Sequence, residues 1–110
     1  MNKETEDQIS QLQMLEQNLQ NITMQKQNFQ AHLFEVENAI KELSESKGPV
    51  YKIVGAIMVS QESGLLKKDL ESKKDLLEMR VKNLKKQEDS IKEKAGKIQA
   101  EVVKVLQSAK

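Results

Sequence analysis

Residue types that build compact domains are scarce in this chain of 110 residues. Cysteine and tryptophan are absent, and aromatic residues make up only 3% of the sequence. The lack of cysteine excludes disulfides and thiol chemistry, which is compatible with the cytoplasm, where we expect the protein. The lack of aromatics argues against an ordinary globular domain, because so short a chain needs bulky side chains to bury enough surface.

Signatures of catalysis are also missing. No GxxxxGK[ST] phosphate-binding loop occurs, so ATP use is not expected. His32 is the single histidine, and no histidine cluster can therefore hold a metal ion. Glu88 and Asp89 are adjacent, but neighbouring residues on a helix point in different directions. We predict that the chain is not an enzyme and that it has no cofactor and no metal site.

Neither a long apolar run nor a large net charge is present. The longest run, IVGAIMV at 53–59, is far shorter than the roughly 20 residues of a membrane helix. The formal net charge is +1. Residues 1–47 are acidic and residues 48–110 basic, but two helices lying side by side would largely cancel this asymmetry. We predict no membrane and no nucleic-acid partner.

What the sequence does have is two long heptad patterns. In the first half, apolar residues step by three and four: Leu12, Leu15, Leu19, Ile22, Phe29, Leu33, Val36, Ile40 and Leu43, with Lys26 as a polar break. In the second half the steps are Leu70, Leu77, Val81, Leu84, Ile91, Ala95, Ile98, Val102 and Val105, with Lys74 and Glu88 as breaks. Such stepping predicts coiled-coil helices over residues 1–47 and 65–110. Gly48 suits a left-handed helix end, and Pro49 prevents continuation.

Equal helix lengths around a short insert predict an antiparallel pair. If Leu43 lies opposite Leu70, counting outward places Lys26 opposite Glu88, whereas Lys74 has no partner. A lysine–glutamate pair in the seam can fix the register of two helices. The alternative is that both side chains extend outward to water.

The insert, residues 48–64, predicts a β-hairpin. VYKIV and IMVSQ are rich in β-branched residues, and Gly55-Ala56 between them fits a two-residue turn. The implied pairs run from Val54 with Ile57 to Val50 with Gln61. Both faces would be largely apolar, and an isolated hairpin of that kind is unstable in water. We therefore predict that the hairpin pairs with strands of other chains, through Val50, Tyr51, Ile53, Val54, Gly55, Ile57, Met58 and Val59. The alternative is a local plug on the helix ends.

With its flanking helices, the segment PVYKIVGAIMVSQ at 49–61 resembles the prefoldin family, specifically its beta class. The segments QKQNFQAHLFEVENAIKEL (25–43) and LEMRVKNLKKQEDSIKEK (77–94) extend the resemblance over nearly the whole chain. It implies a single subunit, mainly α, whose long antiparallel two-helix coiled coil carries a central hairpin that joins an intersubunit β-barrel. It also implies a hexamer of two alpha and four beta subunits, which captures unfolded client proteins and passes them to a group II chaperonin without ATP.

The helix ends far from the hairpin are the expected client-binding tips. Apolar residues gather there, both on the seam and beside it: Ile9, Leu12, Met14, Val102, Val103 and Leu106. Two other functions fit parts of the pattern. A structural tether or scaffold would explain the helices but not a hairpin with two apolar faces. A basic RNA-binding arm would use the lysines of the second helix, which has no aromatic residue to stack on bases.

Overall fold

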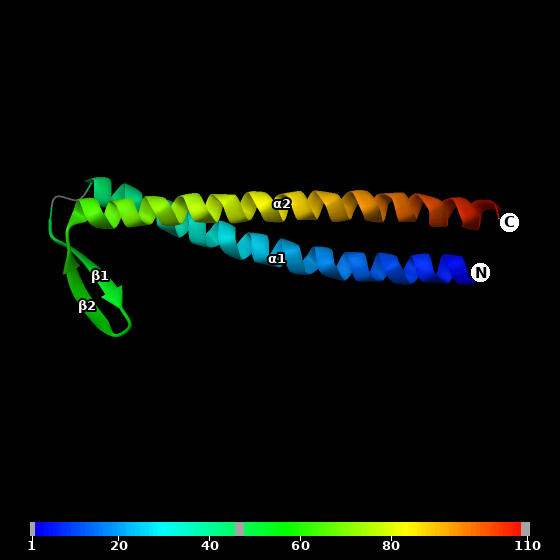
Figure 1. The fold of residues 1–110 in the computed structure, drawn as a ribbon, viewed down its shortest axis with the longest axis horizontal. Coiled ribbons are helices and arrows are strands. Elements are labelled where there is room, and N and C mark those ends of the chain that lie inside the picture. Colours follow the sequence, from blue (N-terminus) through cyan, green and yellow to red (C-terminus); the bar gives the residue numbers. More distant parts are fainter. Residues whose placement is uncertain (1, 46–47, 109–110) are drawn as a thin grey trace. The chain divides into compact units, whose positions relative to one another are not determined.

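The computed structural model describes residues 2–45 and 48–108, which form four elements (Figure 1). In chain order they are helix α1 (Lys3–Glu45), strands β1 (Val50–Val54) and β2 (Ile57–Gln61), and helix α2 (Ser63–Ser108). The prediction of a mainly helical chain with one central hairpin is confirmed. The predicted helix residues 1, 46, 47, 109 and 110 lie outside the described part.

Helix α1 begins at a well-formed cap. The side chain of Asn2 accepts a hydrogen bond from the backbone N–H of Thr5 at 2.8 Å, and Glu4 and Glu6 place negative charge in the first turn. Both features stabilise a helix N-terminus. At the other end the described part of α1 stops at Glu45. Residues 46 and 47 lie outside the described part, so the capping role of Gly48 stays a prediction.

The hairpin has the predicted register. Val50 pairs with Gln61, Tyr51 with Ser60, Lys52 with Val59, Ile53 with Met58, and Val54 with Ile57. Gly55 has a φ of 61°, and Ala56 has no positive φ, which is the pattern of a turn with glycine at its first central position. Alternation along the strands puts Val50, Lys52, Val54, Ile57 and Val59 on one face, and Tyr51, Ile53 and Met58 on the other.

The described chain divides into two compact units, each treated by itself. The terminal unit comprises residues 1–27 and 82–110, and the hairpin unit comprises residues 28–81. In each, a segment of α1 lies beside a segment of α2 that runs in the opposite direction (Figure 1). The predicted seam residues from Leu12 to Val102 are all buried or half-buried, whereas Val105 is 39% exposed.

The core of the hairpin unit is a narrow stripe. Val36 and Leu77 are its buried apolar residues, and the guanidinium of Arg80 lies 5.5 Å from the centre of the Phe29 ring. This distance fits a cation–π contact between the two helices. Lys74, predicted to lack a partner, has its Nζ 3.9 Å from a carboxylate oxygen of Glu78, one turn further along α2.

The terminal unit is held by the same kind of stripe with polar additions. Leu84 and Val102 are buried, and so are the polar residues Thr5 and Glu88. Near the termini, Gln8 Nε2 donates a hydrogen bond to Glu101 Oε2 at 2.8 Å. The α1 and α2 segments of this unit are therefore joined both by apolar packing and by specific polar contacts.

Candidate assembly and binding surfaces

The hairpin carries the largest group of uncovered apolar side chains in the hairpin unit. Ile53 is 70% exposed, Ile57 67% and Met58 65%. Tyr51, Val54 and Val59 are also exposed, and Val50 is half-buried. We call residues 50–59 the hairpin surface. Within the described residues the sheet has two strands, so the outer edge of each strand has no neighbour. Both the apolar faces and the backbone groups of these edges are available to another chain.

A hollow of about 260 Å³ lies at the base of the hairpin. Its lining comes from both helices and from β1: Ala39, Glu42, Leu43, Val50, Tyr51, Leu66 and Leu70. Gln61, which pairs with Val50 across the hairpin, has a buried side-chain oxygen without a hydrogen-bond partner. A buried acceptor of this kind is unfavourable unless another group reaches it. The base of the hairpin is thus apolar and incompletely satisfied in the single chain.

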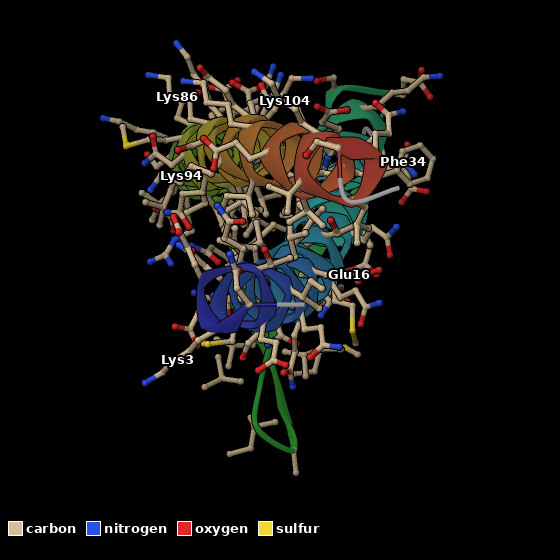
Figure 2. The ribbon with its side chains drawn as sticks, turned by 90° about the vertical axis from the view of Figure 1, so that its right-hand side faces the viewer. Lys3, Glu16, Phe34, Lys86, Lys94 and Lys104 are labelled. Atoms are coloured by element: carbon tan, nitrogen blue, oxygen red, sulfur yellow. The ribbon has the colours of Figure 1, made fainter. Side chains whose placement is uncertain are left out.

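Other exposed apolar residues of the hairpin unit were not singled out from the sequence. Phe34, Leu65 and Leu76 are each about half exposed or more, and the ring of Phe34 points outward from α1 (Figure 2). All three lie outside the heptad seam. The sequence signal that could have found them is a large apolar residue at a helix position outside the seam.

The predicted tip residues fall into two groups in the terminal unit. Met14, Val103 and Leu106 are exposed. Ile9, which was predicted beside the seam, is half-buried, as is Leu12. Val102 is only 7% exposed, because it occupies a seam position. In this structure Val102 therefore supports the helix pair, and the predicted tip residues that are accessible are Met14, Val103 and Leu106.

A second hollow, of about 300 Å³, opens in the same unit beside Ala95. Its lining is mostly apolar: Leu12, Leu15, Leu19, Ile91 and Ala95, with Glu16 and Gln99. The short side chain of Ala95 borders this space, whereas the other seam positions carry larger residues. Outside the seam, Lys86 and Lys104 point from α2 away from α1 (Figure 2).

The structure brings Lys26 and Glu88 together. Lys26 Nζ lies 2.7 Å from Glu88 Oε1, and Thr23 Oγ1 donates a hydrogen bond to Glu88 Oε2 at 2.7 Å. The hydrogen bond from Lys26, followed by that from Thr23, holds the pKa of the Glu88 carboxyl below its ordinary value, while burial opposes this shift. The charges of Lys26 and Lys92 act in the same direction as the hydrogen bonds.

None of the helices described here is both long and apolar enough to cross a membrane. In residues 2–45 and 48–108, no group of three or more histidine, cysteine, aspartate or glutamate side chains is arranged to hold a metal ion. His32 lies on the surface, with Nδ1 3.7 Å from a carboxylate oxygen of Glu35.

These features define a helical subunit with one uncovered hairpin, and comparison with known proteins gives its family. A model of the family described as "Prefoldin subunit" matches residues 6–109. The prefoldin beta subunit of Archaeoglobus fulgidus is 35% identical over 100 residues, which are 89% of this chain and 86% of that protein. That of Pyrobaculum aerophilum is 33% identical over 107 residues, 96% of this chain and 85% of that protein.

A solved structure agrees with the sequence relatives. The crystal structure of the prefoldin beta subunit from Thermococcus strain KS-1 matches with a TM-score of 0.90 and 29% identity, over 96% of this chain and 94% of that one. The chain therefore belongs to the prefoldin family, in its beta class. Prefoldin subunits are non-enzymatic components of chaperone type, and the beta subunits form hetero-oligomers with other prefoldin subunits.

Proposed function

We propose that this chain is the beta-class subunit of an ATP-independent chaperone that captures unfolded polypeptides and passes them to a group II chaperonin in the cytoplasm. The assembly proposed is a hexamer of two alpha-class and four beta-class subunits, whose hairpins close into a β-barrel. Family membership supports this proposal. The observation that carries the assembly step is the hairpin surface, which keeps two apolar faces in water.

Assembly would remove the cost of these exposed residues. A two-stranded hairpin is marginal by itself, and apolar surface gains roughly 25 cal/mol per Å² when it leaves water. Strands from neighbouring subunits would cover both the faces and the open edges. The lysine at position 52 interrupts one face only, so most of the hairpin surface can be buried without stranding a charge.

Client capture is proposed at the exposed apolar residues of the terminal unit. Met14, Val103 and Leu106 lie there with the hollow beside Ala95. Exposed apolar side chains bind exposed apolar segments of an unfolded chain, and methionine adapts to varied partners. Three side chains offer little apolar surface, so each contact with a client would be weak and reversible. A chaperone that releases its client without ATP requires contacts of this kind.

The native mass of the complex tests the proposal. The tagged chain, captured gently from its own cell extract, should be found with three further copies of itself and two copies of a longer alpha-class subunit. Replacing Ile53 and Ile57 with lysine should reduce the complex to monomers or small oligomers, because both faces then carry charge. The control replaces Met24, a similarly exposed apolar residue on α1, with lysine and should keep the complex intact. A wild-type monomer would refute the assembly.

A further inference from the structure

We propose that two copies of this chain pair with each other through strand β2, in antiparallel register about a two-fold axis at Val59. The inference rests on the proposed function, in which the hairpin assembles, and it adds which strand makes the contact between identical subunits. The result would be a four-stranded sheet in the order β1, β2, β2 of the second copy, β1 of the second copy.

The two outer edges of the hairpin differ in charge. Strand β2, with the sequence IMVSQ, has no charged residue, whereas β1 has Lys52 at its centre. Lysine on an edge strand opposes pairing with another strand. Pairing of β1 with its own copy in full register would set the two Lys52 side chains directly opposite each other, which is destabilising. A two-residue slip would preserve the faces but leave only three of the five residues opposed.

The register of the hairpin decides which backbone groups are free. Hydrogen-bonded and non-hydrogen-bonded pairs alternate along an antiparallel ladder, and the pair that closes a two-residue turn is a hydrogen-bonded one. With Val54 and Ile57 closing the turn, Lys52 and Val59 direct their backbone groups toward each other. Met58 and Ser60 then direct theirs to the open edge of β2.

These free groups fit a two-fold axis at Val59. Met58 of one copy lies opposite Ser60 of the other, so their outward N–H and C=O groups bond in both directions. The two Val59 residues form the non-hydrogen-bonded pair between them, where side chains approach most closely. On β1 the corresponding central pair would be the two Lys52 residues, at that same closest spacing. The uncharged edge is therefore the one suited to self-pairing.

The same pairing brings the apolar end of one hairpin to the base of the other. Ile57 of one copy falls opposite Gln61 of the second, beside the hollow that Val50 and Tyr51 help to line. Ile57 is 67% exposed in the single chain, and it would be covered there. Strand β1 keeps its outer edge for a strand whose sequence differs, as expected if a different subunit completes the barrel.

Single cysteines test this arrangement, because the natural chain has none. Two residues opposed as a non-hydrogen-bonded pair have Cα atoms about 4.5 Å apart, within the range that a disulfide spans. The assembled full-length chain carrying Val59→Cys, treated with oxidised glutathione, should therefore form a linked dimer of twice the 12.6 kDa chain mass. The matched control is a mixture of Tyr51→Cys and Ile53→Cys chains, which keeps Lys52. Their cysteines would meet if β1 paired with its own copy about Lys52, and they should stay unlinked.

The other outcomes overturn the proposal. Linkage of Tyr51→Cys to Ile53→Cys, with or without linkage of Val59→Cys, would mean that β2 is not the selective edge. Linkage only between mixed Val59→Cys and Lys52→Cys chains would indicate head-to-tail pairing. An assembled complex in which Val59→Cys stays unlinked would refute this inference and leave the proposed function standing, whereas a monomeric wild-type chain would refute both.

A charge variant gives a second, independent readout. Val59→Lys sets two lysines opposite each other across the proposed axis and should abolish contact between identical copies, measured by native mass of the chain purified alone. Val54→Lys introduces the same change on the same face but on β1 and should retain the contact. Equal loss in both variants would contradict a role for β2 in particular.

Discussion

Lys26 Nζ and Glu88 Oε1 lie 2.7 Å apart at the one place in the terminal unit where both helices put a charged residue into the seam. Thr23 satisfies the second carboxylate oxygen from the same helix as Lys26. Glu88 is only 4% exposed, and both of its carboxylate oxygens nevertheless have hydrogen-bond donors. An arrangement of this kind favours one register over its neighbours, because any slip leaves a charge in an apolar stripe.

Charge reversal tests whether the pair selects the register. Lys26→Glu should lower the urea midpoint of unfolding, because two carboxylates then meet in the seam, and Glu88→Lys should do the same with two ammonium groups. The double reversal should recover most of the loss, since the pair is restored with the opposite polarity. A double variant as unstable as the sum of the single variants would show that the two residues do not interact.

The depressed pKa of Glu88 predicts a pH-dependent loss of stability. The folded state binds the proton less readily than the unfolded state, so the contribution of Glu88 is complete above the ordinary carboxyl pKa of 4.5 and is lost as the pH falls through the lower folded value. In urea unfolding, the advantage of the natural chain over Glu88→Gln should therefore shrink as the pH is lowered from 7 to 3. Glu93→Gln is the control, because Glu93 lies on the surface beside Lys97. An advantage that did not change with pH would contradict the assignment.

Two glycines should respond oppositely to alanine. Gly96 lies inside α2 with open space where a Cβ would be, so Gly96→Ala should stabilise the chain by about 0.5–1 kcal/mol through helix propensity. Gly55 has a φ of 61°, and Gly55→Ala should weaken the hairpin by roughly 1–2 kcal/mol. Thermal unfolding should report the first change, and the mass of the assembled complex the second. Destabilisation by Gly96→Ala would show that this position needs the bare backbone.

Polar replacement of the accessible terminal residues tests client capture. Met14→Gln, Val103→Thr and Leu106→Gln together should reduce suppression of aggregation of a denatured test protein severalfold, while the mass of the complex stays constant. Removal of residues 1–12 and 103–110 should have the same effect. The control is Met24→Gln with Met79→Thr, two exposed apolar residues away from the chain ends. Full protection by the triple variant would rule out these residues as the binding surface.

Local rules were enough to predict most of the fold. The heptad stepping identified the seam, because apolar spacing determines which residues of each helix face the other. The hairpin register followed from Gly55-Ala56, because a two-residue turn leaves only one way to pair the flanking residues. The capping role of Gly48 stays a prediction, because residues 46 and 47 before it lie outside the described part.

The candidate surfaces were less predictable for a physical reason. The heptad spacing separates seam residues from surface residues, but it does not predict how exposed a side chain beside the seam is, as for Ile9. It also left open whether Lys26 and Glu88 pair or extend to water. The hydroxyl of Thr23, a residue that no seam pattern selects, completes the environment that keeps the Glu88 carboxylate inside. Contacts among three residues of different heptad positions require the three-dimensional arrangement of the helices.

A chain that has not yet met its partners keeps Ile53, Ile57 and Met58 in water. Exposed apolar strands with free edges are the features that promote aggregation of incompletely folded proteins. Before assembly, the subunit therefore presents the same kind of surface that we propose it binds in its clients. A cell that produced this chain in excess of its partners would add to the pool of aggregation-prone proteins, so balanced synthesis of the subunits follows from the chemistry of ten residues.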